Sequence, residues 1–455
     1  MSYTKELSAF CADLTYDSIP RDAAGKAKLC LLDYLANIYG SLELEAVRSV
    51  VDYVRSLGGP ETATALGCGF KTGLQNAAFI NGTTAEAIEA QDGLRFGGNH
   101  PVSAVIPAAL ASAELTGAGG KKVIEAVVAG YEVANRIAAS MHPHHTLSGF
   151  LPTGTCGTFG AAAAVAKIMD YSEVQTLNAI GNAGYLLPLS MAEQLMGGYT
   201  IKIVQGGQAA SAGIMAAGLA GSGITSCPVV LEGSHLNGGF TQITTNSDPN
   251  LDKLTEELGT HFTISDIYFK PYTACRHTHG AVQAALELVQ KEKIDPASIE
   301  AVNVFTYGVA LMAVGKSVPE GGSFVSAQFS IPYLVAAAIT DGELGPVQIT
   351  EKRIKDQSLI NLADRVSVAV DDDLNCLYPD KTASRVEIKL VGGACFKSQV
   401  EIPKGDPRDP MLDDALVEKV KLFAGNREEK KLNKAIELIM NLENLDNLDQ
   451  LLPLI

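Results

Sequence analysis

Residues 207–220 read Gly-Gln-Ala-Ala-Ser-Ala-Gly-Ile-Met-Ala-Ala-Gly-Leu-Ala, and this stretch says most about the fold. Its apolar residues recur three and four positions apart, which predicts a helix. Nearly all of its side chains are small, as they are in the run of four alanines at 161–164. Small side chains at helix contacts let backbones approach closely. The sequence therefore predicts a compact helical bundle.

The same periodicity extends outward over residues 4–260, with Gly and Pro between the segments. The predicted helices are 23–39, 43–57, 74–90, 104–116, 120–140, 157–169, 173–183 and 207–220. Residues 1–261 are therefore predicted to form a large all-helical domain.

Residues 262–402 show a different pattern. Alternating residues predict strands at 301–307, 365–370 and 386–391, with helices at 280–292 and 332–340 between them. This part is a predicted smaller α+β domain. Two more helices, 412–424 and 428–441, are too few for a third domain, so residues 403–455 are expected to pack back on the first. The fold class is mainly α.

The charge composition of the chain limits the classes of molecule that it is expected to bind. The chain has 51 Asp plus Glu against 35 Lys plus Arg, a formal net charge of −16. Such acidity argues against nucleic acid and against an anionic membrane surface. The first residues lack a secretory pattern and no apolar run is long enough to span a bilayer, so we expect a cytoplasmic protein.

Neither a metal nor a cofactor is predicted. The eight cysteines are scattered and never form Cys-x-x-Cys, and no glycine run has the surroundings of a phosphate or dinucleotide loop. The histidines in Met141-His-Pro-His-His145 lack the further ligands of a zinc site.

Residues 266–280 gather positive and proton-carrying side chains in this acidic chain. Lys270, Cys275, Arg276, His277 and His279 lie within ten positions. Such a cluster can bind a small anion locally and can transfer protons. The net negative charge of the chain repels anions at long range, so binding would depend on this local positive charge. A solvated turn before the next helix is the alternative.

Six motifs then occur in a fixed order and resemble the MmgE/PrpD family, whose members include 2-methylcitrate dehydratase, cis-aconitate decarboxylase and iminodisuccinate epimerase. The resemblance implies a large helical domain completed by the C-terminus, an α/β lid over residues 262–402, and usually a homodimer. The motifs are Asn99-His-Pro-Val-Ser103, Pro152-Thr-Gly-Thr-Cys-Gly-Thr-Phe-Gly160, Lys202 with Gln208-Ala-Ala210, Lys270-Pro-Tyr272, Gln328-Phe-Ser-Ile-Pro-Tyr333 and Pro403-Lys-Gly-Asp-Pro407.

The resemblance places catalytic residues on the first domain. His100 lies in a Gly-rich loop, and imidazole titrates near neutral pH, so it is expected to carry a proton. Glu89 and Asp92 are three apart at a predicted helix end, so both are expected on one face, orienting His100 or holding a proton. A solvated helix end is the alternative. Lys202 before a helix start is expected to bind a carboxylate.

On the lid, Lys270 matches a family active-site lysine. Cys275 falls near a position where some relatives carry His, and Lys270 or Arg276 is expected to lower the pKa of its thiol. Which of Cys275, His277 and His279 faces the site stays open.

The remaining residues expected to bind substrate are Arg276, His277, His279, Thr153 and Gln205.

Leu151 departs from the resemblance, which leads us to expect a His there. One imidazole of the 141–145 run is a possible substitute, with a polar surface loop as the alternative for that run.

The resemblance implies an acid–base enzyme, with no cofactor, acting on a small di- or tricarboxylate. A dehydratase of the 2-methylcitrate type comes first. An iminodisuccinate-type epimerase is second because Leu151 removes a proton carrier, a cis-aconitate-type decarboxylase is third, and a non-catalytic carboxylate-binding protein is the last alternative.

Overall fold

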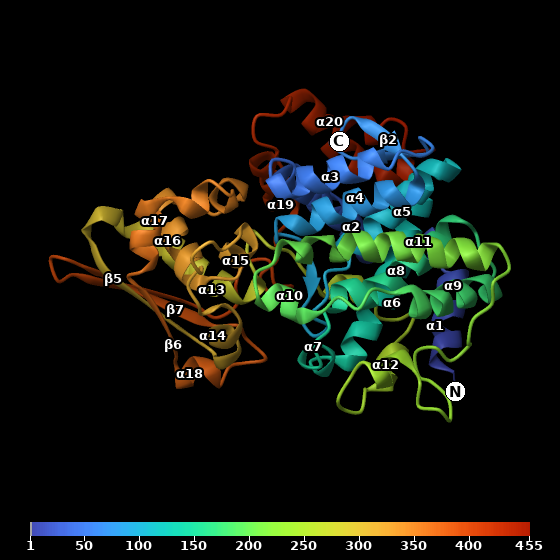
Figure 1. Cartoon of the computed structure of the whole chain (residues 1–455), viewed down its shortest axis with the longest axis horizontal. Coiled ribbons are helices and arrows are strands. Elements are labelled where there is room, and N and C mark those ends of the chain that lie inside the picture. Colours follow the sequence, from blue (N-terminus) through green and yellow to red (C-terminus); the bar gives the residue numbers. More distant parts are fainter. Residues whose placement is uncertain (1) are drawn as a thin grey trace.

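Helices rich in Ala and Gly form the centre of the larger of two lobes (Figure 1). The computed structural model describes residues 2–455. At the centre, α6 and α11 pack on α8, flanked by α4 and α5. Their bounds are α4 Leu74–Ala87, α5 Val102–Thr116, α6 Gly120–Met141, α8 Pro152–Ile168 and α11 Gln205–Gly221.

Close backbone approach explains why these helices are built from small residues. A Cβ atom added to Gly160 would lie 2.6 Å from the carbonyl oxygen of Gly130, and one added to Gly213 would lie 2.8 Å from the amide nitrogen of Ala162. Both distances are shorter than atoms tolerate, so larger residues would force the helices apart. The prediction of a mainly helical fold is confirmed.

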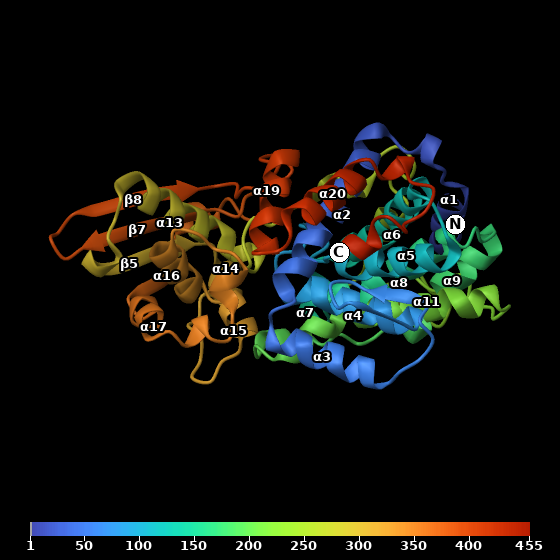
Figure 2. The same ribbon diagram turned by 90° about the horizontal axis from the view of Figure 1, so that it is seen from above.

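Outer helices complete the larger lobe. The C-terminal helices α19 and α20 both pack against α2 there, and both chain ends lie on this lobe (Figures 1 and 2). The outer helices are α1 Tyr3–Asp13, α2 Arg21–Ser41, α3 Glu45–Ser56, α7 His144–Leu147, α9 Glu173–Leu186, α10 Ala192–Met196, α12 Phe240–Ile243, α19 Asp413–Ala424 and α20 Glu429–Met440.

The smaller lobe contains a four-stranded sheet in the order β6-β5-β7-β8, where β5 runs parallel to β6 and the other pairs are antiparallel. Helix α13 packs on β7 and β8, and α16 on β6. Together they bury a separate apolar core around Val302, Val304 and Ile388. The strands are β5 Ile299–Thr306, β6 Val366–Val370, β7 Ser384–Leu390 and β8 Cys395–Val400; the helices are α13 His279–Glu292, α14 Gly308–Val314, α15 Phe324–Gln328, α16 Ile331–Asp341, α17 Gln357–Ala363 and α18 Asp372–Asn375.

Two short ladders correct the prediction that residues 1–261 are all helical. Strands β1 (Ala63–Ala65) and β2 (Phe70–Thr72) form a hairpin. Strands β3 (Gly93–Leu94) and β4 (Ile267–Tyr268) pair antiparallel, with Gly93 opposite Tyr268. This second ladder joins residues on both sides of the predicted boundary at 261/262. Strand β8 was not predicted because its alternation is weak and most of its side chains are at least partly exposed.

Within residues 2–455, none of the helices combines the length and the apolar composition needed to cross a bilayer.

Candidate active site

The loop between α4 and α5 carries the centre of the site. Helix α4 ends at Ala87, and the Gln328 side-chain amide of the smaller lobe donates a 2.9 Å hydrogen bond to the Ala87 carbonyl oxygen. Glu89 then adopts a left-handed backbone conformation with φ of 54°, which is rare outside glycine. The chain therefore leaves the helix before Glu89. The prediction that Glu89 and Asp92 share one helix face is wrong.

Glu89 bridges the two predicted lysines. Its Oε1 accepts a 2.7 Å hydrogen bond from Lys270 Nζ, and its Oε2 pairs with Lys202. Lys202 also forms a 2.8 Å ion pair with Glu86. All four side chains are at least 97% buried, with exposures of 0–3%. We call Glu86, Glu89, Lys202 and Lys270 the four-charge cluster.

Ion pairing outweighs burial in setting the pKa values of Glu89 and Lys202 in this cluster. Burial alone would raise the pKa of Glu89, but Lys202 and Lys270 outweigh it and hold that pKa far below its usual range. Burial likewise opposes the charge of Lys202, yet Glu86 and Glu89 raise its pKa above the usual value. The cluster contains two acidic and two basic side chains, so its formal charges balance.

Glu86 was not predicted as a site residue from the sequence. Its Oε2 accepts a 2.6 Å hydrogen bond from the Ser103 hydroxyl, and its Oε1 accepts one of 2.6 Å from the Gln205 amide. Gln205 therefore reaches the site, but through Glu86. The available signal was spacing, because Glu86 precedes Glu89 by three positions and lies in the last turn of α4.

The β3–β4 ladder brings Lys270 to Glu89 although 181 positions separate them along the chain. A Cβ on Gly93 would collide with the Tyr268 ring, so glycine is needed where the two strands meet. Phe269 is held in turn by Gly405, whose carbonyl oxygen accepts a 3.0 Å bond from the Phe269 amide.

His100 lies next to the cluster with a defined tautomer. Its Nδ1 is 2.6 Å from the Asp92 carbonyl oxygen, which only accepts, so Nδ1 carries the proton and Nε2 is the basic nitrogen. Nε2 lies 3.9 Å from Glu89 Oε1. Thr153 fixes the loop by accepting a 3.0 Å hydrogen bond from the His100 amide.

Burial, with help from Lys270, lowers the pKa of His100 to about 4. The imidazole is therefore neutral at neutral pH, with its basic nitrogen available to accept a proton. Its side chain keeps 16% exposure, so the site reaches solvent here.

Asp92 contributes its backbone rather than its carboxylate. Its Oδ2 accepts a 2.7 Å hydrogen bond from the Tyr131 hydroxyl inside the larger lobe. Burial, and then Asp33, raise the pKa of Asp92 to about 7. The expected projection of this carboxylate toward His100 is wrong; only its carbonyl orients the ring.

The basic stretch divides into residues near the cluster and residues that hold the lobe together. Arg276 donates to the carbonyl oxygens of Lys404 and Pro403 at 2.7 and 2.8 Å. His279 is fully buried, and its Nε2 lies 3.0 Å from the Ala274 carbonyl oxygen. Both side chains bind backbone, which corrects their expected place against substrate.

Cys275 and His277 remain. Burial, followed by Glu89, raises the pKa of the Cys275 thiol to about 11; Lys270 opposes this rise, but it does not bring the pKa below the usual value. His277 is partly buried, and its Nδ1 is 2.6 Å from the Tyr307 hydroxyl. Burial and Lys270 lower its pKa to about 4.

Comparison with known families agrees with this geometry. Residues 5–252 match the MmgE/PrpD N-terminal domain, and residues 272–444 match the MmgE/PrpD C-terminal domain. The chain belongs to the MmgE/PrpD family. The resemblance drawn from the six motifs is confirmed.

Named relatives are similar to this MmgE/PrpD chain over most of its length. Cis-aconitate decarboxylase of Aspergillus terreus (strain NIH 2624 / FGSC A1156) is 27% identical over 99% of this chain and 95% of its own. The cis-aconitate decarboxylase-like protein oryM of Aspergillus oryzae (strain ATCC 42149 / RIB 40) is 26% identical over 99% and 97%. Cis-aconitate decarboxylase of Homo sapiens is 25% identical over 81% and 76%.

Leu151, where the resemblance predicts His, caps the start of α8 and is almost buried. The three nearby histidines differ. His145 is buried, with its nitrogens at 3.1 Å from the Thr244 carbonyl oxygen and 2.8 Å from the Thr155 hydroxyl. His144 is exposed, while His142 is partly buried beside Gly98 of the His100 loop.

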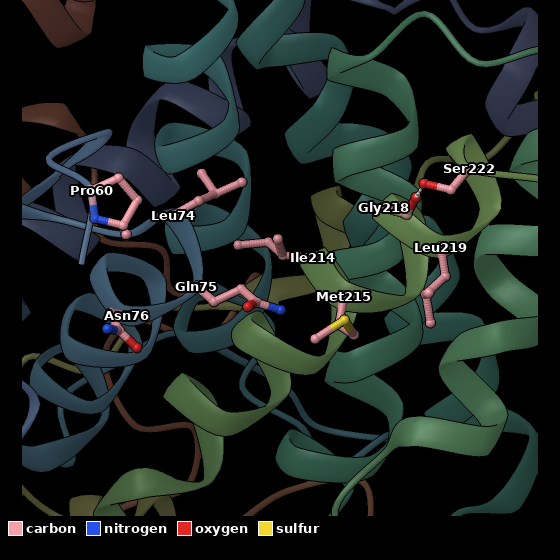
Figure 3. A pocket seen from close by; sticks show the side chains of 10 residues that line it. Pro60, Leu74, Gln75, Asn76, Ile214, Met215, Gly218, Leu219 and Ser222 are labelled. Carbon is pink, nitrogen blue, oxygen red and sulfur yellow. Dashed lines mark hydrogen bonds between the residues drawn. The ribbon is translucent and has the colours of Figure 1, made fainter. Parts of the chain in front are cut away.

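Two cavities lie next to the helices of the larger lobe. One of about 780 Å³ is lined by both lobes, with Arg95 and His142 on the larger and Asp380 and Arg408 on the other side. A second, of about 600 Å³, lies between α4 and α11 (Figure 3). Its lining residues, which include Gln75, Met215 and Ser222, have no acidic or basic side chain. Neither cavity is lined by His100 or by the four-charge cluster, but His142, on the wall of the first, lies beside Gly98 of the His100 loop.

Proposed function

We propose that this protein is a lyase that acts on a small di- or tricarboxylate, with proton transfer at a carbon next to a carboxylate. The observation that carries the proposal is His100: a neutral imidazole, with Nε2 as its basic nitrogen, lies beside two buried lysines. A positioned base and fixed cations are what such a proton transfer needs.

Lys270 and Lys202 would bind the substrate carboxylate adjacent to the reacting carbon. Lys270 has one carboxylate partner, whereas Lys202 has two, so Lys270 exchanges its partner at lower cost. The arriving negative charge also raises the pKa of His100, because an opposite charge nearby favours the imidazolium. Binding thereby prepares His100 to accept a proton, and the resulting imidazolium is compensated by Glu89.

Among lyase reactions we place decarboxylation of a cis-aconitate-like tricarboxylate first, ahead of the dehydration that the sequence favoured. The support is that relatives aligned over 99% of the chain are named cis-aconitate decarboxylase. Dehydration of a hydroxylated tricarboxylate is the second candidate, because it can use the same lysines with His100 as the base that removes the proton.

Incubation with cis-aconitate, citrate, 2-methylcitrate and iminodisuccinate in deuterated water separates the reactions. Release of carbon dioxide identifies a decarboxylase and new alkene absorbance identifies a dehydratase. Deuterium incorporation with neither product would replace the lyase proposal by an epimerase. No reaction with any of the four, combined with tight binding, would favour a non-catalytic carboxylate-binding protein.

Lys202→Met tests the proposed cation site. Because Lys202 neutralises both Glu86 and Glu89, its loss is expected to weaken carboxylate binding and also to lower stability by about 3–5 kcal/mol, the cost of leaving a buried charge unpaired. The sequence alone suggested an effect mainly on binding. An unchanged KM and unchanged unfolding curve would remove Lys202 from the site.

We also propose a homodimer in which a second copy covers residues 185–201. This segment exposes large apolar side chains next to Lys202, including Tyr185 at 92%, Leu189, Met196 and Tyr199. Exposed apolar patches of this kind mark association surfaces. Light scattering should give twice the chain mass, and Met196→Glu should shift it toward one chain mass.

A further inference from the structure

His142 has an imidazole nitrogen that no other group uses. It is the first residue after α6 and is partly buried. Its Nδ1 is inaccessible to solvent and, within residues 2–455, has no hydrogen-bond partner. An unpaired buried polar atom is costly, so its retention calls for an explanation.

The ring lies beside the loop that carries His100, close to the start of α8. A Cβ atom built on Gly98 would lie 3.7 Å from His142 Nδ1 and 3.7 Å from Pro152. Gly98 is two positions before His100, and Pro152 is next to Thr153, which holds the His100 amide. His142 therefore packs directly against the loop that positions the base.

His142 also faces the space between the lobes. It lines the cavity of about 780 Å³, together with Phe96 and Arg95 of the same loop and Asp380 and Arg408 opposite. On the smaller lobe, His277 is near enough for His142 to influence its pKa. The cavity gives His142 a route to solvent protons that the buried lysines lack.

We propose that His142 is the second proton-transfer residue of this site, delivering a proton from the cavity to the substrate. The inference rests on the proposed lyase function, because both lyase reactions named there need a proton delivered, either to the substrate carbon or to the leaving hydroxyl.

His142 would supply one proton in either lyase reaction. In dehydration, the substrate C–H bond breaks and His100 Nε2 takes the proton; the electron pair forms the alkene as the C–O bond breaks, and the His142 imidazolium protonates the leaving hydroxyl to give water. In decarboxylation, the C–C bond breaks and carbon dioxide leaves; its electron pair forms a new C–H bond with the proton from His142. Solvent in the cavity then reprotonates the imidazole.

A bound polyanion makes this role feasible. Burial, and then His144, lower the pKa of free His142, so it is neutral before substrate arrives. Substrate carboxylates favour the imidazolium by opposite charge.

The neighbouring histidines supply the control. His145 has partners for both nitrogens and serves packing. His144 is exposed on α7 and lines neither cavity described above.

His142→Gln keeps a polar side chain of similar reach but cannot shuttle a proton. We expect kcat to fall by about 10²–10⁴-fold, the usual contribution of general acid–base catalysis, with KM changed by less than about threefold. His144→Gln should leave KM unchanged and should alter kcat far less than His142→Gln does, because His144 acts only through the pKa of His142. In His142→Ala, added imidazole should restore part of kcat, since the cavity admits it; a merely structural role would not respond.

A kcat for His142→Gln within about twofold of the wild type, under the same acid–base expectation, overturns the inference while leaving the lyase function intact. If the wild type converts none of the four carboxylates, the proposed function fails. The NMR resonance of His142 Cε1, assigned by its loss in His142→Gln, then tests the inference. A shift of this resonance on adding cis-aconitate or citrate would keep His142 in the carboxylate site. No shift would remove His142 from that site.

Discussion

Two neighbouring groups of buried charged side chains differ in whether they adjoin a partly exposed base. Asp33 and Lys419 pair at 2.6 Å, and Lys419 also donates a 2.6 Å hydrogen bond to the Ala90 carbonyl oxygen. Both side chains are at most 2% exposed. The four-charge cluster is equally buried, yet it adjoins His100, which keeps 16% exposure and a basic Nε2.

The position of each group relative to His100 indicates whether it serves stability or chemistry. The Asp33–Lys419 pair ties the C-terminal helix α19 to α2 and supports the loop that carries Glu89. The four-charge cluster holds three separate segments together, and under the proposed function its lysines exchange a partner for a ligand next to a base. We therefore expect changes at the first group to affect folding and changes around the second to affect turnover.

The largest expected effect comes from His100→Gln. Removing the base should lower kcat by about 10²–10⁴-fold, equivalent to about 2.7–5.5 kcal/mol of transition-state stabilisation. The free energy of unfolding should change by less than about 1 kcal/mol, because within residues 2–455 the ring makes one hydrogen bond. Steady-state kinetics and urea unfolding measure the two quantities. Exposed His235 changed to Gln is the control, and an active His100→Gln enzyme would end the proposed mechanism.

Lys419→Met should act on stability alone. It leaves the Asp33 carboxylate buried with Asn37 as its remaining side-chain partner, at 3.1 Å, so the free energy of unfolding should fall by about 3–5 kcal/mol. Lys421→Met on the same helix removes an exposed pair with Glu418 and should change stability by less than about 0.5 kcal/mol. Equal urea midpoints for the two variants would contradict the importance of the Asp33–Lys419 pair.

Asp92→Asn should alter how stability depends on pH. The pKa of Asp92 is about 7 in the folded protein against an ordinary value of 3.8. Between those values the folded state binds more protons than the unfolded state, so stability falls as pH rises, by up to about 1.4 kcal/mol per unit.

Because asparagine does not ionise, the Asp92→Asn variant should match the wild type near pH 4 and exceed it by a few kcal/mol at pH 8. Urea unfolding across that range checks the prediction, and parallel curves for the two proteins would show that Asp92 is already ionised at low pH.

Cys275→Ser should have the smallest effect. The raised pKa of the Cys275 thiol keeps it protonated at neutral pH, so it does not act as a base or nucleophile. We expect kcat to stay within about threefold of the wild type. A loss of kcat comparable with that of His100→Gln would instead give Cys275 a direct role.

Much of the fold followed from local pattern. The predicted helices at 120–140 and 207–220 agree with α6 and α11 to within two residues, because periodic apolar and small side chains report helix and packing together. The mixed pattern after residue 262 correctly indicated strands 301–307 and 386–391. The weakest signals were the short ladders and the exposed strand β8.

The candidate site was predicted in part. His100, Lys202, Lys270 and Glu89 were all named from the sequence, and the structure brings them together. Their catalytic and binding roles stay predictions. Glu86 was missed because a carboxylate in a helix looks like any solvated residue until its partners are known.

The sequence by itself determined the helical bundle, the family and the types of residue available for acid–base chemistry, since these depend on local periodicity and on motifs. Only the tertiary structure decided which charges meet. Lys270 reaches Glu89 through a ladder between residues far apart in the chain, whereas Arg276 and His279 of the same stretch bind backbone carbonyls. Burial then decided protonation: it keeps His100 neutral and Cys275 protonated, while paired charges keep Glu89 and Lys202 ionised, and no local pattern encodes that balance.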